Sequence, residues 1–159
     1  MTTKSDFSEA DWTRIVRAPF VAGLAISLAD PGGPIEAGKE TMATMRSATN
    51  PPSREQLLAE VALEVQAMAQ DRRHPLQGYK PHQEGAAGSQ VLKELREVQS
   101  LVAATATPEE ATAFAAWLVA SAQAAADAAK EGGFMGFRAQ QVSAGEQAML
   151  DQVREAVSA

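Results

Sequence analysis

The two histidines of this chain lie close together, inside its one locally basic stretch. This stretch combines imidazole, guanidinium, ammonium, phenol and carboxylate groups, carried by Asp71, Arg72, Arg73, His74, Tyr79, Lys80 and His82. Two imidazoles and a carboxylate are a known ligand set for zinc or iron. A basic segment with an aromatic ring also suits an anionic ligand or an acidic partner. These seven residues are therefore the candidate ligand or metal site, with the metal unknown, and a plain connecting loop is the alternative.

A second group of candidates follows a pair of glycines near the carboxyl end of the chain. It contains three large apolar side chains and one cation, namely Phe134, Met135, Phe137 and Arg138. Large side chains in such a place either cover the end of a hydrophobic core or anchor a partner protein. We take these four residues as the candidate partner contacts.

Residues 33–39 match the first seven positions of a phosphate-binding loop, ending at Lys39. In such a loop, consecutive backbone N–H groups face the phosphates, and a hydroxyl after the lysine binds magnesium. Here Glu40 stands at the hydroxyl position and Pro34 removes one N–H group. The motif also requires a preceding strand, which a helical chain does not provide. A nucleotide-dependent enzyme is therefore only the third hypothesis for this protein.

The residue types needed for covalent catalysis are scarce. The chain has no cysteine, which excludes thiol nucleophiles, thiolate metal sites and disulfides. It also lacks the Gly-x-Ser-x-Gly pattern of serine hydrolases. We assign no catalytic residue and no cofactor, and the sequence favours a protein that is not an enzyme while leaving that question open.

The composition predicts an all-α fold. Alanine, the best helix former, is the most frequent residue, and aromatic residues make up only 5% of the chain. We expect a single domain at residues 1–159, a bundle of five to six helices covering about two thirds of the residues, more than the usual third. The Ala-rich helix at about 107–130 is expected at its centre, because small side chains let neighbouring helices approach closely. An irregular loop is expected at about 73–89.

Local signals place the helix ends. Ser8 is a candidate N-cap, and Pro19 is expected to kink or divide the helix that follows. Capping boxes, in which a hydroxyl and a residue three positions later cap each other's backbone N–H groups, are predicted at three further helix starts. They comprise Ser53 with Gln56, Thr107 with Glu110, and Ser143 with Glu146.

The charge and the amino-terminal residues restrict location and partners. A net charge of -6 with scattered basic residues argues against nucleic acid. The chain begins without a basic segment followed by an apolar one, so a cytoplasmic location is expected. The longest apolar run, residues 18–29, falls short of the ~20 residues that span a bilayer, so no membrane contact is expected.

These observations support three functional hypotheses. The first is a non-enzymatic protein-interaction or oligomerisation module of bacterial type, which forms a homodimer or binds another protein. The second is a helical bundle that binds a small anionic ligand or a metal through residues 72–82. The third is the nucleotide-dependent enzyme at residues 33–39.

Overall fold

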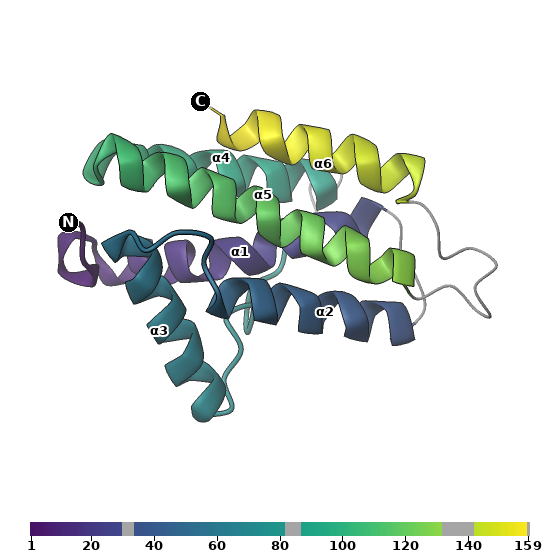
Figure 1. The fold of residues 1–159 in the computed structure, drawn as a ribbon, viewed down its shortest axis with the longest axis horizontal. Helices are drawn as coiled ribbons and strands as arrows, with labels where there is room; N and C mark the ends of the chain where they lie inside the picture. Colours follow the sequence, from purple (N-terminus) through teal and green to yellow (C-terminus); the bar gives the residue numbers. More distant parts are fainter. Residues whose placement is uncertain (30–33, 82–86, 132–141, 159) are drawn as a thin grey trace.

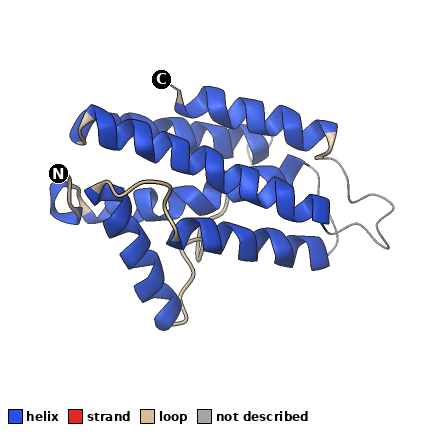
Figure 2. Ribbon diagram, viewed as in Figure 1, coloured by secondary structure: helices blue, strands red, loops and turns tan. Residues whose placement is uncertain are grey.

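A computed structural model of the protein describes residues 1–29, 34–81, 87–131 and 142–158. Within these ranges, 80% of the residues are helical and no strand occurs, which confirms the expected all-α bundle. A short 3₁₀ turn, η1 (Lys4–Asp6), precedes six α-helices (Figures 1 and 2). These are α1 (Glu9–Ala29), α2 (Pro34–Thr49), α3 (Gln56–Gln70), α4 (Ala87–Thr105), α5 (Pro108–Glu131) and α6 (Ala144–Val157).

Two helices share the centre of the bundle. The Ala-rich helix α5 contacts every other α-helix, as predicted, and so does α1. Figure 1 shows α5 crossing the middle of the molecule in front of α1, while α3 projects away from the other helices. The largest fully buried side chains include Phe20 of α1 with Phe114 and Trp117 of α5. Both central helices thus contribute large buried side chains to the hydrophobic core, whose burial stabilises the fold.

Two of the predicted capping boxes are present. Thr107 Oγ1 accepts from Glu110 N at 3.2 Å, and the Glu110 carboxylate accepts from Thr107 N at 3.1 Å. Ser143 and Glu146 make the same reciprocal pair, at 3.2 and 3.1 Å. Each capping box involves only two residues that are three positions apart in the sequence. These two helix starts could therefore be predicted from the sequence alone.

The capping box predicted for Ser53 and Gln56 is wrong. Helix α3 begins at Gln56, its N-cap residue is Glu55, and the Glu55 side chain makes no capping hydrogen bond. The Ser53 hydroxyl accepts instead from Glu55 N at 3.4 Å. Ser53 therefore lies two residues too early to cap the helix, in the turn that follows the two prolines.

Helices α1 and α4 differ from the sequence-based expectation in their extent. Helix α1 runs without a break from Glu9 to Ala29, with Pro19 buried inside it. Helix α4 begins at Ala87, so the expected loop at 73–89 ends earlier than predicted. A Cβ atom at Gly88 would lie 3.1 Å from Met149 Cε of α6. The absence of a side chain at Gly88 thus lets the first turn of α4 approach α6 closely.

Candidate functional site

The segment 71–81 leaves the end of α3 and lies against helices α1 and α4. Arg73 N donates to Met68 O at 2.8 Å, and Arg72 N donates to Ala69 O at 3.1 Å. These two bonds form the Schellman motif that ends many helices, with Arg72 in the left-handed conformation at φ 56°. Further along, Leu76 and Tyr79 pack against the hydrophobic core. The segment is therefore irregular, as predicted, but it is anchored to the bundle.

Arg17 of α1 and Tyr79 of this segment stack on each other. The guanidinium carbon of Arg17 lies 4.7 Å from the centre of the Tyr79 ring, a cation–π contact. Burial raises the pKa of the Tyr79 hydroxyl, and the nearby Glu94 carboxylate raises it further. Tyr79 is therefore a neutral hydrogen-bond donor at physiological pH, and its ring fixes the position of the Arg17 side chain.

Arg14, one turn before Arg17, binds two carboxylates of α4. Its Nε and Nη2 atoms each donate to one oxygen of Glu94 at 2.9 Å, and Nη2 also lies 2.8 Å from Glu97. The hydrogen bond to Glu94 is the main reason why the pKa of Arg14 is raised. Lys93 adds a longer ion pair to Glu97, at 3.8 Å. Both carboxylates thus already have cationic partners within the chain.

Between these residues lies an open cleft of about 720 Å³. Helices α1 and α4 and the segment 71–81 form its walls, which consist of Arg17, Gly78, Tyr79, Lys80, Pro81, Gln90, Lys93, Glu94 and Glu97. The volume falls in the range of clefts that hold small molecules, roughly 300–1,000 Å³. Three cations and two carboxylates line the cleft, and Arg14, which is not a lining residue, binds both carboxylates. The cleft therefore has an excess of positive charge in an acidic protein.

Two of these cations have no anionic partner in the described part of the chain. Arg17 and Lys80 form no ion pair with any residue in those ranges. The Nε atom of Arg17 is buried and has no hydrogen-bond acceptor there. A buried donor without an acceptor is costly, so structures rarely contain one unless a ligand, ion or water binds to it. The arrangement is suited to an oxygen-bearing anion.

The imidazole of His74 points away from this cleft, into a smaller chamber of about 60 Å³ between α1 and α2. Its ring meets Phe20 edge-on at 5.0 Å, and its Nδ1 atom accepts from Leu76 N at 3.1 Å. The buried Glu40, hydrogen-bonded to the Ser27 hydroxyl, lines the same chamber. Burial lowers the pKa of His74, which keeps its ring neutral. The chamber has room for a few water molecules.

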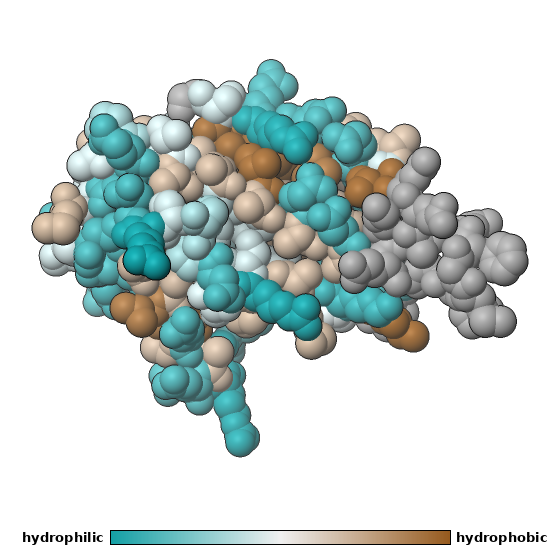
Figure 3. Space-filling model, in the orientation of Figure 1, coloured by the Kyte–Doolittle hydropathy of each residue, from teal (hydrophilic) through white to brown (hydrophobic). Residues whose placement is uncertain are grey.

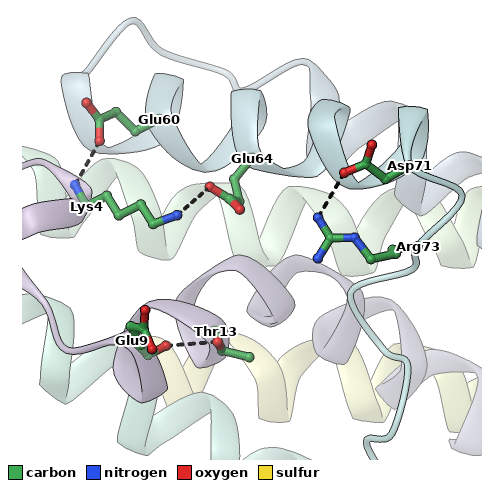
Figure 4. Close-up of polar contacts among 7 residues, drawn as sticks. All are labelled: Lys4, Glu9, Thr13, Glu60, Glu64, Asp71 and Arg73. Atoms are coloured by element: carbon green, nitrogen blue, oxygen red, sulfur yellow. Dashed lines mark hydrogen bonds and ion pairs between the residues drawn. The ribbon is translucent and has the colours of Figure 1, made fainter.

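The structure separates the candidate residues that the sequence grouped together. Tyr79 and Lys80 line the cleft, and His74 lines the chamber, while exposed Arg72 forms the turn after α3. Asp71 forms an ion pair with Arg73 at 3.1 Å, at the carboxyl end of α3. Figure 4 shows this pair at the opposite end of α3 from Lys4. Within the described ranges, no three histidine or acidic side chains form a group able to hold a metal. His82, the other proposed imidazole ligand, lies outside the described residues.

Other predicted candidates fall outside the described ranges or on other faces. Phe134, Met135, Phe137 and Arg138 all lie in the segment 132–141, which the structure does not describe. In the phosphate-loop-like segment, Gly33 is also outside, and Pro34 opens helix α2 with no strand anywhere in the described part of the chain. Glu40 faces the bundle interior and Lys39 is exposed, so their side chains diverge.

Sequence reasoning missed Arg17, whose buried Nε atom lies in the wall of the cleft without an acceptor among the described residues. The signal was present, because Arg14 and Arg17 are one turn apart and interrupt the apolar helix α1. A cation in the middle of a core helix must reach solvent or a polar group. The partners on α4 and at Tyr79 are distant in the sequence, so the position of the cleft was not visible from spacing.

The comparisons with family models, with curated proteins and with solved structures find no match to this chain. The length and composition of α1, by themselves, meet the criterion for a helix that crosses a membrane. However, 61% of the qualifying window is buried inside the bundle, as in a core helix. The cytoplasmic location and the absence of membrane contact remain predictions from the sequence.

Proposed function

We propose that the protein is a non-enzymatic helical binding protein that holds a small anionic ligand in the cleft between α1 and α4. The ligand class is one with a carboxylate or phosphate group, because both present oxygen acceptors to a guanidinium. The observation that carries the proposal is the buried Nε atom of Arg17, a cleft residue, which has no acceptor among the described residues. Lys80 adds a second cation at the same opening.

The neighbouring residues support the same ligand class. Tyr79 holds the Arg17 side chain in place by stacking, so little freedom is lost when the guanidinium binds an anion. Arg14 occupies both oxygens of the Glu94 carboxylate, which reduces its repulsion of an incoming anion. The exposed position of Lys80 suits initial attraction of the ligand more than final binding strength.

Calorimetric titration with inorganic phosphate and, separately, with succinate tests this proposal. The unmodified protein should bind at least one of them, and Arg17→Met should weaken that binding at least about tenfold, because a charge-assisted hydrogen bond is lost. Lys80→Met should have a smaller effect that shrinks as salt is added. Thermal unfolding of each variant establishes that it still folds.

Arg96→Met is the matched control, because Arg96 is an exposed arginine of α4 that does not line the cleft. It removes the same charge and should leave the affinity unchanged. Absence of binding for both anions, or equal weakening by Arg17→Met and Arg96→Met, would contradict the proposal.

A further inference from the structure

A groove separates α2 from α5 on a face of the molecule that does not include the cleft. It has a volume of about 480 Å³ and is lined by Lys39, Met42, Ala43, Arg46, Ala124, Asp127 and Ala128. Three of the lining residues are partly exposed alanines, whose small side chains leave space between the two helices. Figure 3 shows this face, where atoms of intermediate hydropathy over α5 lie between strongly hydrophilic groups.

Large apolar side chains project beside the groove. Met42 is 60% exposed and Ile35 is 73% exposed, both on α2. Ile35, Lys39, Met42 and Arg46 follow each other at spacings of three or four residues, so they share one helix face. Exposed methionine and isoleucine rimmed by charged groups are typical of protein-interaction surfaces.

The two walls of the groove have opposite charges that do not pair with each other. Lys39 and Arg46 on the α2 side are exposed, and neither forms an ion pair with Asp127. Asp127 on the α5 side is exposed and accepts a hydrogen bond from its own helix neighbour Gln123 at 3.0 Å. Each wall therefore exposes charge that the opposite wall does not neutralise.

We propose that this groove binds a second copy of the chain, related to the first by a two-fold axis. In a two-fold interface the same surface is used by both copies, so it must be complementary to itself. The groove meets this requirement. When a second copy lies antiparallel across the groove, Asp127 of the second copy faces Arg46 and Lys39 of the first. The cations of the second copy then face Asp127 of the first. A purely acidic partner protein would place negative charge against Asp127 and repel it. A purely basic partner protein would place positive charge against Arg46 and repel it.

Sedimentation velocity across a protein concentration series measures the association. The unmodified protein should form a dimer of twice 16.8 kDa. Arg46→Glu and Asp127→Lys should each weaken the dimer at least about tenfold, because each creates two like-charge pairs across the two-fold axis. Arg54→Glu and Glu155→Lys make the same charge changes at exposed positions outside the groove and should leave the dimer intact.

Mixing the two groove variants, Arg46→Glu and Asp127→Lys, separates a second copy from any other partner. In an equimolar mixture, the carboxylate introduced at position 46 of one variant would face the ammonium introduced at position 127 of the other. The two unchanged groove residues, Asp127 of the first variant and Arg46 of the second, would also face each other. The mixture should therefore regain the strong association that each variant loses alone. A monomer at every concentration for the unmodified protein, a dimer unaffected by the groove variants, or no recovery in the mixture would each overturn the proposal.

Discussion

Glu110 binds Thr2 and thereby ties the amino-terminal residues to the start of α5. The Glu110 carboxylate accepts from Thr2 N at 2.8 Å and from Thr2 Oγ1 at 2.5 Å, while it also caps Thr107 N at 3.1 Å. Glu110 is only 2% exposed. Burial alone would raise the pKa of Glu110, but the hydrogen bonds from Thr2 outweigh it and lower this pKa to about 2. One side chain thus joins two segments that are far apart in the sequence.

The lowered pKa of Glu110 predicts a loss of stability in acid. Because its folded-state pKa, about 2, is below the ordinary value of 4.5, its contribution is complete above pH 4.5 and is lost as the pH falls toward 2. The contribution is about 3 kcal/mol by linkage. Glu110→Gln should lower the free energy of unfolding at pH 7 by ~2–3 kcal/mol and flatten its acid dependence.

Urea unfolding at a series of pH values measures this effect. Glu109→Gln is the control, because Glu109 is the exposed neighbour in the same helix turn and should change little. The same acid dependence in the unmodified protein and in Glu110→Gln would contradict the assigned role of Glu110.

Arg72 provides a second prediction, because it adopts a positive φ that L-residues with side chains disfavour. Arg72→Gly should raise the free energy of unfolding by up to ~1 kcal/mol, since glycine adopts this conformation without steric cost. Arg72→Val should lower it, because a β-branched side chain suits this conformation least. Gln77→Gly, at a nearby position with ordinary φ, should give no gain, and equal gains from both glycine variants in thermal unfolding would refute the explanation.

His74 gives the protein a separate dependence on pH near neutrality. Burial lowers its folded-state pKa below the ordinary value of 6.5, so the unfolded chain takes up a proton first as the pH falls. Stability should therefore be highest above pH 6.5 and decrease below it. His74→Asn keeps an acceptor for Leu76 N without a titrating ring, so its stability should vary less between about pH 7.5 and about pH 5.5. Denaturant unfolding at these two pH values, with equal changes in both proteins, would show that another group is responsible.

The sequence predicted the features that depend on neighbouring residues. The capping boxes of Thr107 with Glu110 and of Ser143 with Glu146 each involve residues three positions apart. The high alanine content of α5, which is consistent with its central position, is likewise a property of one short segment. The basic stretch was found by composition, and two of its members, Tyr79 and Lys80, do line the cleft.

The features that the sequence did not reveal depend on distant contacts. Arg17 meets Tyr79 only because the segment 71–81 folds back across α1. His74 was grouped with Tyr79 by proximity in the chain, yet its ring faces Phe20 and the α1–α2 chamber. In an irregular segment, the spacing of residues in the sequence does not determine the directions in which their side chains point. Such a segment lacks the fixed periodicity that relates one side chain to the next in a helix or strand.

The ¹H–¹⁵N resonance of the Arg17 Nε–H group tests the proposed function most directly. The signal is assigned by its absence from the Arg17→Met spectrum, and the Arg96 signal serves as the internal reference. On addition of phosphate or succinate, the Arg17 Nε–H signal should move downfield and saturate, because the buried donor gains an acceptor, while the Arg96 signal should stay in place. An Arg17 signal that does not move with either anion, or that moves no more than that of Arg96, would contradict the proposal that this cleft binds anions.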